Sequence, residues 1–230
     1  MGHVGQAIEH APVHVPADSI QLEGTLSIPT AARGVVIFAH GSGSSRHSPR
    51  NRYVADILNE AGLATLLIDL MNADEQEVDL QTGQLRFDIA FLAKRLVAIA
   101  QWLREQPQAS GLKLGFFGAS TGAGAALVAA AELPFVTRAV VSRGGRIDLA
   151  GQALDRVEAP TLAIVGGDDI QVLELNRRAL ARMHAVKSLE VIPGAGHLFE
   201  EPGALEKVAK LAQSWFAGEF ARNVPGDDEW

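Results

Sequence analysis

Apolar and polar residues alternate in the segment from residue 20 to residue 28. One side of it holds Ile20, Leu22, Leu26 and Ile28, and the other holds Gln21, Glu23, Thr25 and Ser27. Such alternation is typical of a strand with one face in water and the other on the core. Val13 and Val15 precede the turn residues Pro16-Ala17-Asp18, so the pattern predicts an antiparallel N-terminal hairpin.

Further along the chain, apolar residues come in short continuous runs. Runs of this kind suit parallel strands buried on both faces, and they lie at residues 35–39, 64–69, 114–117, 139–141, 162–165 and 189–192. Between them, apolar residues recur at helical spacing over 89–103, 172–183 and 205–216. A hairpin followed by repeated strand–helix units predicts an α/β fold, with a mostly parallel sheet and helices on both faces.

The same pattern predicts one domain over residues 1–230, with a core at about 12–220 and loose ends at 1–11 and 221–230. Only about 20 residues separate the strand ending near Ser142 from the one beginning near Thr161. That length is too short for a cap domain, so we expect an open and shallow site.

The composition limits the kinds of partner and site that can be expected. Charged residues make up 20% and the net charge is −7, which argues against a nucleic acid or a membrane surface as partner. The chain has no cysteine, so disulfides, thiolate metal sites and a cysteine nucleophile are excluded. Neither a signal sequence nor a membrane-length apolar run is visible, which makes a cytoplasmic protein the default. We expect no metal or cofactor, a small-molecule substrate, and a monomer or homodimer.

The segment Gly118-Ala119-Ser120-Thr121-Gly122 carries the main chemical signal. It follows an apolar run and opens an alanine-rich run, so it predicts a strand, a sharp turn and a helix with the serine at the apex. That is the setting of a nucleophile elbow. Chance is one alternative, because the chain has 23 glycines. A dinucleotide loop at Gly122-Ala123-Gly124 is another, but Leu127 stands where its third glycine belongs.

A serine nucleophile needs a base and an acid that orients the base. His197 ends a glycine-rich turn after the run at 189–192, and Asp168 and Asp169 follow the run at 162–165. The order serine, aspartate, histidine is that of a nucleophile-elbow hydrolase. Spacing favours Asp169, and Asp168 remains the alternative. His40 and His47 remain candidates for residues that face the substrate.

The oxyanion of such a reaction needs two N–H donors. One is expected from Thr121 at the helix start. The second is expected from the glycine-rich loop at residues 40–45, where Ser42 follows His40-Gly41.

These motifs together resemble the α/β-hydrolase superfamily, and the short, capless length resembles its dienelactone hydrolase-like branch. The likeness runs from about residue 20 to 216 and rests on the segments 40–45, 118–122, 166–169 and 194–197. It implies Ser120 as nucleophile, Asp169 as acid and His197 as base, with the amides of Ser42 and Thr121 as oxyanion hole. Dienelactone hydrolase itself uses a cysteine nucleophile, so the resemblance implies the reaction class rather than the lactone substrate.

Basic residues also cluster at the predicted strand ends. Arg46, His47 and Arg143 are candidate substrate-binding residues, because arginines there can bind a carboxylate or phosphate. The alternative is that the arginines pair with carboxylates such as Asp69 or Glu200.

Three functions therefore stand after the sequence analysis. The first is a serine hydrolase that cleaves a small ester, thioester or lactone, with or without an anionic group, through an acyl-enzyme. The second is a non-catalytic α/β-hydrolase fold used for ligand binding. The third is an acyltransferase or perhydrolase that uses the same acyl-enzyme.

Overall fold

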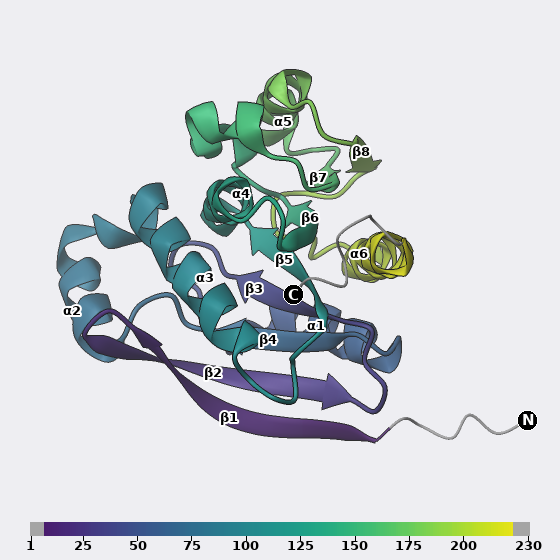
Figure 1. Cartoon of the computed structure of the whole chain (residues 1–230). Coiled ribbons are helices and arrows are strands. Elements are labelled where there is room, and N and C mark those ends of the chain that lie inside the picture. Colours follow the sequence, from purple (N-terminus) through teal and green to yellow (C-terminus); the bar gives the residue numbers. More distant parts are fainter. Residues whose placement is uncertain (1–6, 223–230) are drawn as a thin grey trace, which may run out of the picture.

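A computed structural model describes residues 7–222. Its strands form one eight-stranded sheet in the order β1-β2-β4-β3-β5-β6-β7-β8 (Figure 1). The strands are β1 (Ile8–Ala17), β2 (Ile20–Pro29), β3 (Gly34–Ala39), β4 (Ala64–Ile68), β5 (Lys113–Ala119), β6 (Thr137–Arg143), β7 (Thr161–Gly166) and β8 (Lys187–Ile192). Strand β2 pairs antiparallel with β1 and β4, and the strands from β4 to β8 are parallel.

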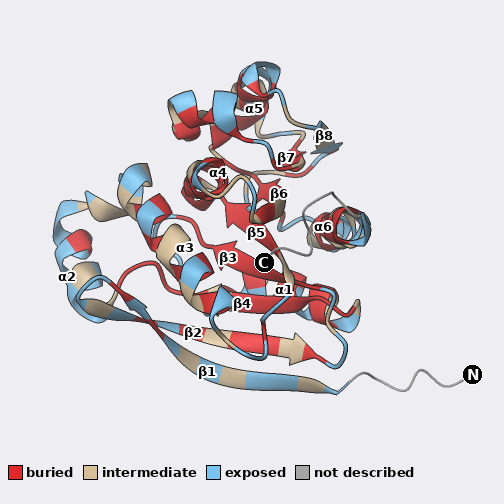
Figure 2. Cartoon of the chain, in the orientation of Figure 1, coloured by how far each residue is buried: buried red, intermediate tan, exposed pale blue. Residues whose placement is uncertain are grey.

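Helices cover both faces of the sheet. They are α1 (Pro49–Glu60), α2 (Ala73–Thr82), α3 (Ile89–Arg104), α4 (Thr121–Glu132), α5 (Ile170–Arg182) and α6 (Ala204–Ala221), with short 3₁₀ segments η1 (Leu85–Phe87) and η2 (Ile147–Arg156). Helices α3, α4 and α5 pack on one face, and α1 and α6 pack on the other (Figure 1). The central strands are buried, whereas the helices expose their outer surfaces (Figure 2).

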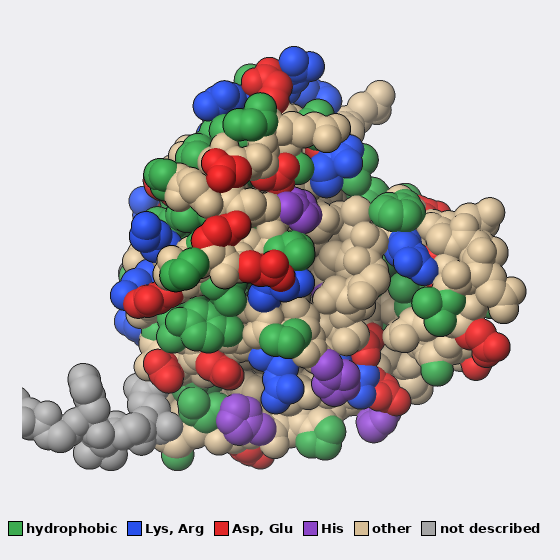
Figure 3. All heavy atoms as spheres, turned by 180° about the vertical axis from the view of Figure 1, so that it is seen from behind, with side chains coloured by type: hydrophobic (Ala, Val, Ile, Leu, Met, Phe, Trp, Pro, Cys, Tyr) green, Lys and Arg blue, Asp and Glu red, His purple; other side chains and the backbone are tan. Residues whose placement is uncertain are grey.

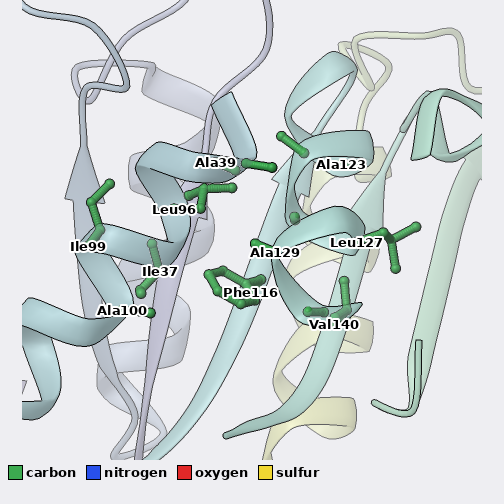
Figure 4. Close-up of a cluster of buried hydrophobic side chains, with 14 of the residues drawn as sticks. Ile37, Ala39, Leu96, Ile99, Ala100, Phe116, Ala123, Leu127, Ala129 and Val140 are labelled. Atoms are coloured by element: carbon green, nitrogen blue, oxygen red, sulfur yellow. The ribbon is translucent and has the colours of Figure 1, made fainter. Parts of the chain in front are cut away.

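Neighbouring residues of β5 show why the apolar runs are continuous. Phe116 packs into the cluster beneath α3 and α4 (Figure 4), whereas Phe117 packs into the cluster beneath α1 and α6. There the Phe117 ring lies 4.8 Å from that of Phe38, centroid to centroid. Because successive strand residues point to opposite faces, both faces must be apolar where helices cover both.

The structure confirms the predicted hairpin, the parallel strands and the four predicted helices, α3, α4, α5 and α6, and it adds α1, α2 and η1. Helix α2 is largely polar, so its sequence shows no apolar pattern and the helix was not predicted. Its start nevertheless has a capping box between Asn72 and Glu75. The chain forms only η2 between β6 and β7, in agreement with the expected lack of a cap domain.

The N-terminal boundary was predicted too late. Strand β1 begins at Ile8, inside the segment 1–11 that was expected to be loose. Its first residues are partly or fully exposed, and ladder pairing with β2 holds them rather than burial. His10 also hydrogen-bonds Ser27 through Nδ1 and Oγ at 2.8 Å. At the other end α6 continues to Ala221, and the remaining predicted loose residues, 1–6 and 223–230, lie outside the described part.

The surface carries charges of both signs. Acidic and basic side chains are interspersed on the face seen in Figure 3. Within residues 7–222, no helix combines the length and the apolar character needed to cross a bilayer.

The core assignment predicts the effect of truncating Phe116. Its side chain is fully buried, so Phe116→Ala should lower the free energy of unfolding by about 3–5 kcal/mol through lost burial and a residual cavity. The control is Phe135→Ala, because Phe135 is 72% exposed, and it should change stability by less than about 0.5 kcal/mol. Urea denaturation measures both. Equal losses in the two variants would contradict this packing.

Candidate active site

Ser120 occupies a strained turn between β5 and α4. Its dihedral angles are φ 51° and ψ −123°, in a region that residues with a β-carbon rarely adopt. Main-chain bonds to the end of β6 hold it there: the Ser120 N–H donates to the Arg143 carbonyl at 3.3 Å, and its own carbonyl accepts from the Arg146 N–H at 2.9 Å. Gly118 is required because a β-carbon there would overlap the backbone of Ala123. The predicted sharp turn is therefore present.

Asp169 and His197 lie together at the ends of the last two strands. His197 Nδ1 is 2.6 Å from Asp169 Oδ2, and the Asp169 side chain is 14% exposed, whereas Asp168 is exposed. A carboxylate accepts the Nδ1 proton, which leaves Nε2 with a lone pair for a proton. The loops that follow β7 and β8 are in close contact: the Asp168 N–H donates to the Ala195 carbonyl at 3.0 Å.

The corner formed by Arg143 and Gly144 joins the elbow to the histidine loop. Arg143 holds the Ser120 N–H, as described above. A β-carbon added at Gly144 would lie 3.0 Å from the His197 carbonyl oxygen and 3.6 Å from its Cε1 atom. Ser120 is thus held by Arg143, and His197 adjoins the next residue, Gly144, at the carboxyl ends of the parallel strands where ligands bind in such sheets.

The loop after β3 packs against the start of α4. A β-carbon at Gly122 would overlap the carbonyl oxygens of Ala39 and His40, and one at Gly41 would lie 3.0 Å from Ser120 Cβ. The Ser42 N–H donates to Thr121 Oγ1 at 3.0 Å. The two predicted oxyanion residues are therefore adjacent. The contact through the Thr121 hydroxyl was not foreseen, because no sequence pattern relates side chains 79 positions apart.

His40 is buried behind this loop instead of facing a substrate. Its Nδ1–H donates to the Gly41 carbonyl at 3.1 Å, and Nε2 accepts from the Leu70 N–H at 3.2 Å. These bonds define the neutral tautomer. Burial lowers the pKa of His40, against the opposing effects of the Gly41 carbonyl and Asp69.

Arg46 and His47 do not gather at the elbow. The guanidinium of Arg46 contacts Asp69 through Nη1 and Glu23 through Nη2, the latter at 2.6 Å. The backbone N–H of Arg46 also donates to Asp69 Oδ1. Its charge is thus matched by two carboxylates, as the alternative interpretation expected for Asp69. His47 is exposed, and its N–H donates to Ser45 Oγ at 3.2 Å.

Arg143 has a different environment. It is 8% exposed, and its Nη2 donates to the neutral Asn51 amide at 3.4 Å. Within the described residues its Nε has no hydrogen-bond partner, and the same holds for Nε of Arg50. Burial, with a smaller contribution from the Arg50 charge, lowers the pKa of Arg143 to about 10. A buried cation without a carboxylate partner is costly, so this position is suited to an incoming anion.

Comparisons with known proteins bear on the family and the fold of the chain. The model of the dienelactone hydrolase family matches residues 22–217. The chain is similar to a dienelactone hydrolase from Anabaena variabilis, with 58% identity, a TM-score of 0.90, and coverage of 92% of this chain and 98% of that one. It resembles Est1E from Butyrivibrio proteoclasticus in fold, with 17% identity, a TM-score of 0.77, and coverage of 92% and 99%.

A curated relative from Mycobacterium tuberculosis is longer. That protein is provisionally named a phosphoribosyl transferase, and it is 57% identical over 204 residues, which is 89% of this chain and 45% of its own length. The chain thus spans about half the length of the curated relatives it matches. A match of this extent includes the segment from Ser120 to His197.

The burial of His40 predicts a pH dependence of stability. Because its pKa is lowered in the folded protein, the unfolded chain binds more protons below the ordinary value of 6.5. The free energy of unfolding should therefore fall as the pH drops below that value, by up to about 1.4 kcal/mol per pH unit. Urea denaturation from pH 8 to pH 5 measures this slope.

His40→Asn removes this titrating group and should flatten the slope. His47→Asn is the control, because His47 is exposed and the slope should remain. Equal slopes in His40→Asn and the unchanged protein would show that His40 does not remain neutral in the fold.

Proposed function

The chain belongs to the dienelactone hydrolase family and has its α/β-hydrolase fold, and from that premise we propose that it is a serine hydrolase. Ser120 is the nucleophile, His197 the base and Asp169 the acid that orients the base. The observation that carries the proposal is the 2.6 Å contact between His197 Nδ1 and Asp169 Oδ2. It directs the basic Nε2 away from the carboxylate, on a loop that packs against Gly144, the residue after the one that holds the Ser120 N–H.

The reaction is acyl transfer to water. Ser120 Oγ attacks the acyl carbon while its proton passes to His197 Nε2, and a tetrahedral oxyanion forms. Collapse breaks the bond to the leaving alcohol or thiol, which takes the proton from His197. Water then loses a proton to Nε2 and attacks the acyl-enzyme, which releases the acid and restores the Ser120 hydroxyl.

Exposure of the base favours water as the acceptor. The His197 side chain is 39% exposed, and the chain between β6 and β7 forms only η2. Bulk water therefore reaches Nε2 without a lid having to open. We assign hydrolysis of a small ester, thioester or lactone to this chain, ahead of acyl transfer or ligand binding without catalysis. The strained serine supports a catalytic role, because such backbone strain is concentrated at functional sites.

The substrate proposal adds Arg143. The backbone carbonyl of Arg143 holds the elbow, its guanidinium is buried, and the neutral Asn51 leaves the charge unmatched. We assign it to a carboxylate or phosphate of the substrate. Arg46 is left out of this assignment, because Asp69 and Glu23 already hold it.

The nucleophile can be tested with a fluorophosphonate probe and an aryl ester. The unchanged protein should be labelled and should hydrolyse 4-nitrophenyl butyrate, and Ser120→Ala should abolish labelling and lower kcat by on the order of 10⁶. Ser142→Ala is the control, since Ser142 is a fully buried serine of β6. A folded but unlabelled protein would favour the ligand-binding function.

The role of Arg143 can be tested with a charged and a neutral ester of similar size. Arg143→Met keeps the length of the side chain and removes its charge. The ratio of kcat/KM for 4-nitrophenyl hemisuccinate to that for the butyrate should fall about tenfold, the effect of one lost charge-assisted bond. Arg178→Met, on the exposed side of α5, should leave the ratio unchanged. An equal loss on both esters would refute the assignment.

A further inference from the structure

The hydroxyl of Thr121 contacts one of the two backbone groups that the family pattern implies as oxyanion donors. The pattern implies the amides of Ser42 and Thr121 as donors to the oxyanion. In the structure the Ser42 N–H is already bonded, because it donates to Thr121 Oγ1 at 3.0 Å. Either this bond breaks when a substrate reacts, or the hydroxyl itself faces the oxyanion.

The surroundings keep the two groups in place. Gly122 and Gly41 press the loop after β3 against the elbow, and His40 fixes the Gly41 carbonyl. The Ser42 N–H follows directly from that carbonyl, so its direction is set by the same peptide unit. Thr121 is 5% exposed and is the first residue of α4. A threonine in a helix is restricted to two χ1 rotamers, and the bond from the Ser42 N–H favours one of them.

A threonine hydroxyl can accept one bond and still donate its own proton. Here the accepting site is used by Ser42, which leaves the O–H for another acceptor. The N–H of Thr121 also lacks an acceptor within its helix, since it lies in the first turn. One anion can then receive both the N–H and the O–H of this residue, next to the positive end of the helix dipole.

We infer that the Thr121 hydroxyl is a direct donor to the oxyanion, in a chain that runs from the Ser42 N–H through Thr121 Oγ1–H to the reacting oxygen. This inference rests on the proposed serine hydrolase. Ser42 polarises the hydroxyl and holds it, and the oxygen that becomes charged accepts from the hydroxyl and the amide of one residue. Hydrogen bonds in such a chain strengthen one another.

This chain of hydrogen bonds also explains why the Ser42 N–H is bonded to Thr121 Oγ1 before a substrate binds. Donors that are already oriented need no reorganisation when charge develops. Release of the Ser42 N–H would instead require a buried, β-branched side chain to rotate and a hydrogen bond to break during each turnover. If the Thr121 hydroxyl is the donor, the bond from Ser42 stays intact throughout each turnover.

Two substitutions of Thr121 separate the possibilities. Thr121→Val keeps the shape and the backbone N–H but removes the hydroxyl, and Thr121→Ser keeps the hydroxyl. With 4-nitrophenyl butyrate, kcat should fall about 10²- to 10³-fold in Thr121→Val, the effect of losing one oxyanion donor, with little change in KM. In Thr121→Ser it should stay within about fivefold of the unchanged protein.

A boronic acid inhibitor gives a second readout. It forms a tetrahedral adduct with a serine Oγ, so its inhibition constant should rise in Thr121→Val by a factor similar to the loss in kcat. Thr65→Val is the matched control, because it also removes the hydroxyl of a buried threonine. The Thr65 hydroxyl hydrogen-bonds Asn59 of α1, on the face of the sheet opposite to α4. It should keep kcat and the inhibition constant.

The outcomes are distinct. If Thr121→Val retains or raises kcat, the hydroxyl only blocks the Ser42 N–H and the inference is overturned. If Thr121→Ser loses as much as Thr121→Val, the methyl group and not the hydroxyl matters, which overturns it as well. Thr121→Ala replaces the valine variant if urea denaturation shows that the latter is unfolded. Loss of the proposed function itself would appear differently, as an unlabelled, inactive protein with Thr121 intact.

Discussion

The close approach of the β3 loop to the first turn of α4 is the constraint on which the site depends. Strands β3 and β5 are parallel neighbours, with Ala39 opposite Gly118, so the chain leaves both strands at the same level. Two glycines, Gly41 and Gly122, then allow the loop and the helix to touch through their backbones. The Ser42 amide and the Thr121 hydroxyl meet because of this contact. A side chain at either glycine would separate these two groups.

Much of the fold could be predicted from the sequence because helices cover both faces of the sheet. Phe116 and Phe117 are both buried, so their strand appears as an unbroken apolar run. Helix α2 has no such signature, since its buried residue is the polar Asp79. The start of β1 was missed for a related reason: backbone pairing holds it, and backbone pairing leaves no hydrophobic pattern.

The candidate site was predictable where a motif fixes local geometry. Ser120 lies in a glycine pattern, between a strand and a helix, that predicts a sharp turn, and Asp169 and His197 follow glycine-rich strand ends. Partners that meet through space were not predictable. Arg46 and Arg143 are equivalent in sequence terms, but one meets two carboxylates and the other meets the neutral amide of Asn51. Only the packing of α1 and β6 distinguishes the two arginines.

The proposed nucleophile and the proposed acid–base pair follow strands that differ in how well the rest of the sheet supports them. Ser120 follows β5, at the centre of the sheet between two large clusters. Asp169 and His197 follow β7 and β8, and β8 is an edge strand whose residues are mostly exposed or half-buried. Local opening at such an edge costs less free energy than unfolding of the core. Fraying of β8 would thus displace the proposed base while the strained serine remained in place, so that the proposed activity would be lost before the fold is.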